Sequence, residues 1–205
     1  LIVLTAMMVM VSTSAFALLS GSSHDFSSTG TGYDDQICRP CHTPHNGDLT
    51  VSDAPLWNHD LTTTTGYITY GVGADMEQSV GVPTGISLLC LSCHDGTVAV
   101  NAYPGFTPPA VFIAAGNAAN LGTDLSNDHP VSFDYSVHQG TDGFLHAETV
   151  SGSDIYVTDP LVRLFGTDGT LECASCHDVH NKYNQTGLLV KSNSGSDLCL
   201  DCHNK

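Results

Sequence analysis

Basic side chains are scarce in this sequence. Of its 205 residues, 5 are Lys or Arg and 21 are Asp or Glu, which gives a formal net charge of −16. Nucleic acids and anionic membrane surfaces are bound through clustered positive charge. The composition therefore argues against nucleic acid as a partner.

Long apolar stretches and long amphipathic patterns are also lacking. Only 13% of the residues are charged, and 20 Gly and 9 Pro are present, so no large core of helices or sheets is expected. The apolar run at residues 1–11 is well short of the roughly 20 residues that span a bilayer. Ala15-Phe16-Ala17 follows it, which is typical of a secretory cleavage site. We therefore expect a signal peptide at residues 1–17, a single domain at 18–205 and no membrane span.

The cysteines form four pairs, each with two residues between its members and a His directly after the second Cys. The cysteines are Cys38, Cys41, Cys90, Cys93, Cys173, Cys176, Cys199 and Cys202, and the histidines are His42, His94, His177 and His203. This Cys-x-x-Cys-His motif is the attachment signature of c-type haem. Two thiols on one helical turn form thioethers to the haem vinyl groups, and the adjacent His ligates the iron. The sequence predicts four covalently bound haem c groups, with these four His as proximal ligands.

Three other uses of paired cysteines compete with this interpretation. Secreted chains use them in disulfides, zinc sites use Cys-x-x-Cys pairs, and a Cys-x-x-Cys pair alone can be a redox dithiol. None of the three requires a His after each second Cys, so the repeated His favours haem.

Each iron also has a His available as its second axial ligand. The histidines outside the motifs are His24, His45, His59, His129, His138, His146 and His180. Met76 is the one methionine after the predicted signal peptide, so Met is a poor competitor.

Two of these histidines, His45 and His180, each follow a proximal His by three residues. A His at that distance does not easily reach across its own haem plane, but it can ligate the iron of a neighbouring haem. The predicted distal ligands are His24, His45, His129 and His180, with His59 in reserve; His138 and His146 are expected to be ordinary residues.

An iron with two His ligands has no position open to a substrate. We therefore expect an electron carrier rather than an enzyme, with other redox proteins as donor and acceptor. A multihaem reductase would need an open iron position and a pocket lined by acid and base groups. An accessory subunit of a larger redox complex would share the carrier's chemistry and differ in its partners.

Local patterns predict mostly irregular coil, with short helices at the haem motifs and a few short β-hairpins. The four haems are expected to form the core in place of extensive side-chain packing. Strands are predicted at residues 66–71, 131–135 and 154–158, and a hairpin is predicted to join residues 161–165 and 171–173 through a turn at 166–170.

Five segments carry a more specific likeness. They are Ser-His-Asp-Phe at 23–26, Cys-His-Thr-Pro-His-Asn at 41–46, Pro-Leu-Trp-Asn at 55–58, Asp-His-Pro-Val at 128–131 and Glu-Cys-Ala-Ser-Cys-His-Asp-Val-His-Asn at 172–181. These segments resemble the multihaem c-type cytochromes of metal-reducing bacteria, and most of all the tetrahaem extracellular cytochrome nanowire (OmcE-like) type.

The resemblance implies a coil-rich fold around a continuous chain of haems, in alternating stacked and T-shaped pairs with two His on every iron. It also implies that one distal His comes from the adjacent subunit, a role that falls on His24. The protein would then be a homopolymeric filament outside the cell, used for respiration to external acceptors. A discrete periplasmic tetrahaem carrier is the alternative.

Overall fold

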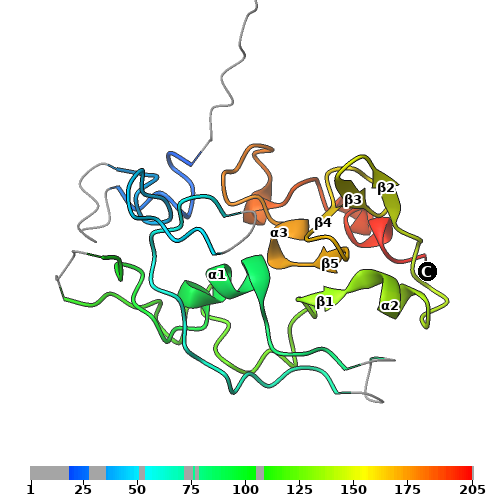
Figure 1. Ribbon diagram of the computed structural model, residues 1–205, viewed down its shortest axis with the longest axis horizontal. Helices are drawn as coiled ribbons and strands as arrows, with labels where there is room; N and C mark the ends of the chain where they lie inside the picture. The colour runs from blue at the N-terminus through cyan, green and yellow to red at the C-terminus, as the bar shows by residue number, and fades with distance from the viewer. Residues whose placement is uncertain are drawn as a thin grey trace, which may run out of the picture.

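The computed structural model describes residues 19–27, 36–50, 54–71, 76, 79–104 and 109–204. The predicted signal peptide at 1–17 lies outside these ranges. Most of the described chain is turn and coil, and the short helices and strands lie toward the middle and one end of the molecule (Figure 1). In the described ranges, no helix combines the length and apolar character that a membrane span requires.

The regular elements are short, as the sequence predicts. In chain order they are α1 (Gly85–His94), β1 (Phe133–Asp134), α2 (Tyr135–Gln139), β2 (Thr149–Ser151), β3 (Asp154–Tyr156), β4 (Arg163–Leu164), β5 (Thr170–Leu171), α3 (Cys173–Cys176) and the 3-10 helices η1 (Thr186–Leu188), η2 (Ser194–Ser196) and η3 (Cys199–Asp201). The expected coil-rich fold with few helices and short strands is confirmed.

Three of the four haem motifs lie in helices. The second motif forms the end of α1, the third forms α3, and the fourth begins with η3. The first motif is a turn, so the expected helix is absent there. Pro40 explains the difference, because it has no N–H that could bond to Gln36 and extend the turn.

The strands form two small antiparallel sheets. One has the order β2-β3-β4, with Ile155 of β3 opposite Leu164 of β4, and the other pairs β1 with β5. The strand predicted at 154–158 is present as β3, but it ends at Tyr156. The strand predicted at 131–135 is shorter, because Tyr135 begins α2 and the side chain of Asp134 accepts a hydrogen bond from the Val137 amide at the helix start.

The predicted hairpin at 161–173 is present and joins the two sheets. Phe165 and Thr170 exchange two backbone hydrogen bonds of 2.8 and 2.7 Å around the turn. Gly166 and Gly169 both have a φ of 69°, a conformation that favours glycine. Because β4 pairs with β3 and β5 pairs with β1, this turn fixes one sheet relative to the other.

The strand predicted at 66–71 is wrong. Ile68 forms only an isolated parallel bridge with Asp124, and its side chain is exposed, whereas Tyr67 is buried against Leu91 and Leu125. A strand needs a continuous partner to satisfy its backbone groups, and this segment finds one at a single residue.

Side-chain packing is divided among three small clusters in the described residues. They are Tyr135 with Val157, Leu164 and Leu171; Tyr67 with Leu91 and Leu125; and Val162 with Val190 and Leu198. Each cluster borders a motif, since Cys202 packs against the first and third clusters and Leu91 lies within the second motif. The chain therefore gathers its apolar side chains around the motifs rather than into one core.

Candidate functional site

Each Cys-x-x-Cys-His motif is closed by a backbone hydrogen bond into a turn, which is part of a helix in all but the first motif. The amide of the motif His donates to the carbonyl of the first Cys at 2.9 Å in the first motif, 3.0 Å in the third and 2.9 Å in the fourth. In the second motif, the same residues form the last turns of α1. Residues three apart share one face of such a turn, so the two thiols of each pair lie on one side, as haem attachment requires.

Three of the four proximal histidines are held by the same kind of hydrogen bond. Nδ1 lies 2.8 Å from the Pro55 carbonyl in His42, 2.7 Å from the Ala119 carbonyl in His94, and 2.8 Å from the Gly187 carbonyl in His177. A carbonyl oxygen only accepts, so Nδ1 must carry the proton. This tautomer leaves the Nε2 lone pair for a metal and fixes the ring's orientation, as outer partners do in metalloproteins.

The first and third motifs build this support in the same way. After His42, the chain loops back so that Trp57 pairs with His42, and after His177 it loops back so that Leu189 pairs with His177. Asn46 and Asn181 occupy equivalent positions in these loops and have φ values of 59° and 53°. Asn tolerates this left-handed conformation, which turns the chain back toward the motif.

Three pairs of imidazole rings lie opposite each other across gaps of nearly equal width. The planes of His42 and His180 are within 11°, whereas those of His24 and His94 are inclined by 62° and those of His129 and His203 by 72°. The ring centroids of His24 and His94 are 6.0 Å apart, those of His42 and His180 are 6.2 Å apart, and those of His129 and His203 are 6.4 Å apart. Two imidazoles on opposite sides of one metal, with bonds of about 2.0 Å, have their centroids about 6.2 Å apart. The spacing of these rings therefore fits an iron between each pair.

His177 differs from the other proximal histidines, because no ring contact pairs it with another His among the described residues. His45 is exposed, and its hydrogen bonds involve only its backbone, to the Thr43 hydroxyl. Three predicted distal histidines thus lie opposite proximal ones, and His45 does not. Burial lowers the pKa of His24 to about 4, and His94 and His177 both add to the effect, so His24 also lies near His177. His24 lies against His94 of its own chain, which does not favour the intersubunit role expected for it.

The position of His59 indicates a structural role. It is buried, with Nδ1 2.7 Å from the Asp60 carbonyl and Nε2 2.9 Å from the Ala99 carbonyl. Both ring nitrogens are therefore occupied by backbone oxygens, although the ring also lies 3.5 Å from Cys93 Sγ. This position does not favour the reserve assignment of His59 as a ligand.

The two remaining histidines lie near the fourth motif. His138 is buried in α2, where its ring packs against Phe133 with centroids 4.4 Å apart. The backbone amide of His146 donates to the Cys202 carbonyl at 2.8 Å. The ring of His146 faces no proximal His in the described part of the chain.

All eight cysteines are unpaired thiols. In the described residues, no group of three or more His, Cys, Asp or Glu side chains has the arrangement of a metal cage. The disulfide and zinc interpretations therefore find no support in the geometry.

The thiols of successive motifs lie close enough to affect one another. Burial raises the pKa of Cys93 to about 12, and the nearby Cys41 thiol adds to the effect. The interaction of Cys90 with Cys173 raises the pKa of the Cys90 thiol well above its usual value and lowers the pKa of Cys173. The first motif therefore adjoins the second, and the second adjoins the third.

The same relation links the third motif to the fourth. Burial raises the pKa of Cys176 to about 11, with contributions from Cys173 and Cys199, and burial with the neighbouring Cys176 raises the pKa of Cys202 to about 12. The four attachment sites therefore follow one another in space in the order of the chain.

Asp95, directly after His94, holds the end of α1. It is buried and accepts hydrogen bonds from the Tyr67 hydroxyl at 2.6 Å, the Thr62 hydroxyl at 2.8 Å and the Thr97 amide at 2.7 Å. Burial alone would raise the pKa of Asp95, but these hydrogen bonds outweigh it and lower the pKa. The carboxylate thus anchors the second motif to residues 62–67.

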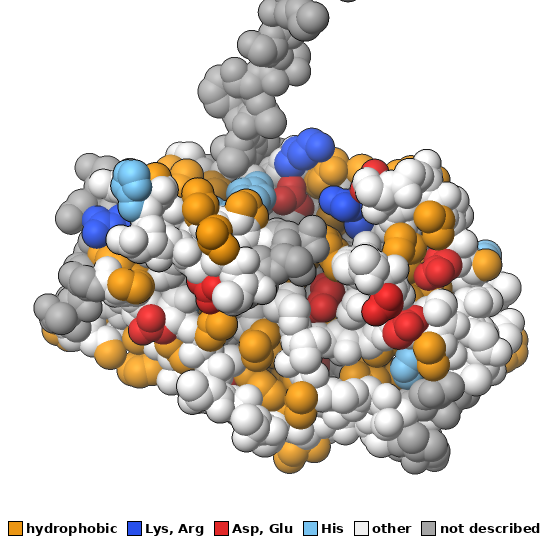
Figure 2. Space-filling model, in the orientation of Figure 1, with side chains coloured by type: hydrophobic (Ala, Val, Ile, Leu, Met, Phe, Trp, Pro, Cys, Tyr) orange, Lys and Arg blue, Asp and Glu red, His pale blue; other side chains and the backbone are white. Residues whose placement is uncertain are grey.

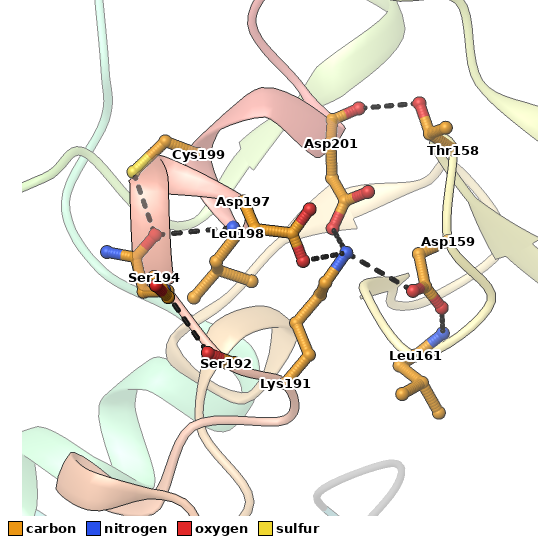
Figure 3. Close-up of polar contacts among 11 residues, drawn as sticks. Thr158, Asp159, Leu161, Lys191, Ser192, Ser194, Asp197, Leu198, Cys199 and Asp201 are labelled. Carbon is orange, nitrogen blue, oxygen red and sulfur yellow. Dashed lines mark hydrogen bonds and ion pairs between the residues drawn. The ribbon is translucent and has the colours of Figure 1, made fainter.

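Lys191 holds the fourth motif in place. Its Nζ lies 3.0 Å from a carboxylate oxygen of Asp197, 3.0 Å from one of Asp201 and 3.3 Å from one of Asp159 (Figure 3). Asp201 is buried inside the motif, and its carbonyl accepts a hydrogen bond from the Thr158 hydroxyl. Burial would lower the pKa of Lys191, but the three carboxylates raise it overall.

Sequence reasoning missed Glu172 as a structural residue. It precedes the third motif, is 3% exposed, and accepts hydrogen bonds from the Ser87 amide at 3.1 Å and the Ser132 hydroxyl at 3.0 Å. It thereby joins α1 to α3, which lie side by side in Figure 1. Its position directly before the third motif could have drawn attention to it. Its partners Ser87 and Ser132 are too distant in sequence to be predicted.

One family model, described as a doubled CXXCH motif, matches residues 167–205. The match covers the third and fourth motifs, whose thiols adjoin in the structure. The paired motif is typical of multihaem c-type cytochromes, which transfer electrons, and it implies covalently bound haem c. A comparison with curated proteins gave no match.

Proposed function

We propose that this chain is a tetrahaem c-type cytochrome that carries electrons and catalyses no reaction. The observation that supports it best is the set of three facing imidazole pairs, whose centroids lie 6.0, 6.2 and 6.4 Å apart. Each pair joins a proximal His to one of the predicted distal histidines. Haem c bound at the motifs would supply one-electron redox chemistry at its iron.

The chain's own residues would hold each group from both faces. The two thiols of a motif form the covalent attachment, and the motif His binds from one side through the Nε2 that its Nδ1 hydrogen bond leaves free. His24, His180 and His129 face His94, His42 and His203 from the other side. An iron held by two of these imidazoles would have no position open to substrate or water, which favours a carrier over a reductase.

The spatial order of the motifs supports conduction along the chain. Neighbouring thiols interact between the first and second, second and third, and third and fourth motifs. Electrons entering at either end would therefore meet the sites in succession. On the face in Figure 2, acidic side chains are spread over the surface and Lys and Arg are few, so a redox partner with a basic docking surface fits best.

We further propose that the protein is secreted and assembles with copies of itself into an extracellular filament. The supporting observation is that no ring contact pairs His177 with another His in the described part of the chain, while His45 is exposed. In a filament, His45 of one subunit would lie opposite His177 of the next and complete the fourth pair at each junction. His45 would then be the distal ligand that crosses between subunits, a role first expected for His24. A discrete periplasmic carrier, or a subunit of a redox complex, is the alternative.

Haem counting tests the first proposal. Mass spectrometry of the mature protein should show four haem additions, and replacing Cys199 and Cys202 together by Ala should remove one. Magnetic circular dichroism should show low-spin iron with two His ligands. Fewer than four haems in the native protein, or a high-spin iron that binds nitrite in the assembled protein, would contradict it.

Electron microscopy of His45→Ala tests the filament. Native protein should form filaments, His45→Ala should fail to form them, and His146→Ala should behave as the native protein does. If the native protein forms discrete particles in which every iron has two ligands from its own chain, the filament proposal is wrong and the carrier proposal stands.

A further inference from the structure

Glu172 caps a helix that lies far from it in sequence. Thr84, at the N-cap position of α1, makes no side-chain cap, whereas the Glu172 carboxylate accepts hydrogen bonds from the amide and the hydroxyl of Ser87, 85 positions away. Gly85, with a φ of 53°, makes room, because a Cβ there would lie 2.6 Å from Glu172 Oε1. A distant carboxylate thus occupies the helix N-terminus, where negative charge is favoured.

Among the described residues, no cation pairs with this carboxylate. Its hydrogen bonds come from Ser87 and Ser132, which are neutral, and no ion pair involves it in the described part of the chain. Burial raises the pKa of Glu172, and the hydrogen bonds from the two serines offset this only in part. The charged form is therefore held less firmly than in a salt bridge.

Glu172 lies between two haem attachment sites. It directly precedes Cys173, and the Ser87 hydroxyl that donates to it also accepts from the Cys173 amide at 2.9 Å. The Cys90 and Cys173 sulfurs face it from α1 and α3, close enough for its charge to act on both thiols, although the mutual interaction of the two thiols is the larger effect on each pKa. With haem attached, these sulfurs would be uncharged thioethers. The segment before β1 contributes only the Ser132 hydroxyl. An electron added at either attachment site would bring negative charge near Glu172 and would raise its pKa.

Ser132 gives this carboxylate a connection to the surface. Its φ is 61°, which is strained for a residue other than glycine. In this conformation its hydroxyl contacts both Glu172 and the backbone of Thr84, which is exposed. The half-buried Ser132 hydroxyl therefore lies between the buried carboxylate and the exposed Thr84.

We propose that Glu172 binds a proton when the irons at the second and third motifs are reduced, so that electron transfer there is coupled to proton uptake. The inference rests on the proposed function. Glu172 takes one proton from solvent and becomes a neutral carboxyl group for one electron that an external reductant such as dithionite delivers to a neighbouring iron. The added negative charge makes the charged carboxylate less favourable, because burial weakens screening between them.

Redox titrations of the native holoprotein and of Glu172→Gln at several pH values test the proposal. In the native protein, a midpoint potential should fall as pH rises through the range in which Glu172 titrates, and Glu172→Gln should lose this dependence. Ser132→Ala should move the range to higher pH, because it removes a donor to the charged form. Asp168→Asn removes an exposed charge four residues away and should keep the native dependence.

Infrared difference spectra provide a readout independent of the potentials. Reduced-minus-oxidised spectra should show a protonated carboxyl band in native protein that is absent from Glu172→Gln. The same pH dependence in both proteins, or the same band in both, would overturn the proposal. A pyridine haemochrome assay distinguishes failure of this proposal from failure of the proposed function. If the chain binds no haem c, the proposed function is wrong; if it binds haem and the pH dependence is unchanged in Glu172→Gln, only the role of Glu172 is wrong.

Discussion

The imidazole rings of His42 and His180 face each other with centroids 6.2 Å apart and planes within 11°. His42 belongs to the first motif, whereas His180 follows the third motif by three residues. The third motif thus supplies the ring opposite the first motif's proximal His. That His180 ligates the iron of a neighbouring haem rather than its own stays a prediction.

Replacing His180 by Ala tests this pairing. One haem should lose its second ligand, so electron paramagnetic resonance of the ferric protein should show a new high-spin signal from one of the haems while the others stay low-spin. His146→Ala is the matched control and should leave every haem low-spin. Identical spectra for both variants would mean that His180 is not a ligand.

Removing the Lys191 ammonium should destabilise the region around the fourth motif. Lys191→Met leaves the buried Asp201 without its cation, and breaking a buried pair costs about 3–5 kcal/mol. The pKa of Lys191 is raised, so its contribution is complete below about pH 10 and disappears only as pH rises through the folded-state pKa. Urea unfolding of the holoprotein at pH 7 measures the loss.

Arg163→Met provides the control for Lys191. Its pair with Asp154 at 3.1 Å is exposed on both sides, and such pairs are worth about 0–1 kcal/mol. Equal losses for the two variants would show that burial of Asp201 does not matter.

The helical turns and the hairpin could be predicted from sequence because they are local. Cys-x-x-Cys-His sets the turn within five consecutive residues, and the two glycines of the turn at 166–170 fit its left-handed positions. The pairing of β1 with β5 could not be predicted, because Phe133 meets Leu171 only after the intervening chain has folded.

The hydrogen-bond acceptors of the proximal histidines could not be predicted from the sequence either, for a different reason. The acceptors for His42, His94 and His177 are the backbone carbonyls of Pro55, Ala119 and Gly187. Every residue has a carbonyl, so no residue type marks this role. The positive φ of Gly187 and Asn181 is the part that sequence can suggest.

Gly47 should be essential to the loop that supports His42. A Cβ there would lie 2.6 Å from Leu56 Cα, and this contact is with backbone that cannot rotate away. Gly47→Ala should therefore destabilise the holoprotein by about 1–3 kcal/mol, the usual cost of overpacking. Thermal unfolding measures the loss. Gly66→Ala, where nothing lies within 4 Å of the added Cβ, should be nearly neutral; an equal effect would mean that the loop adjusts freely.

The titration of Glu172 should make the free energy of unfolding depend on pH. Burial raises its folded-state pKa above the unfolded value of about 4.3. Between the two values the folded protein binds more protons than the unfolded one, so the free energy of unfolding falls as pH rises. Glu172→Gln has no such group, and its stability relative to the native protein should therefore increase from pH 4 upward and then level off.

Urea unfolding of the ferric holoprotein between pH 4 and 8 makes this comparison, with Asp168→Asn as the control that should show no such gain. A purely structural cap predicts the opposite result, since losing a charged helix cap costs about 0.5–2 kcal/mol at neutral pH. If Glu172→Gln is less stable than the native protein and the gap widens as pH rises, the folded protein favours the charged form. Glu172 would then be an anchor for α1 and α3, and a poor proton acceptor.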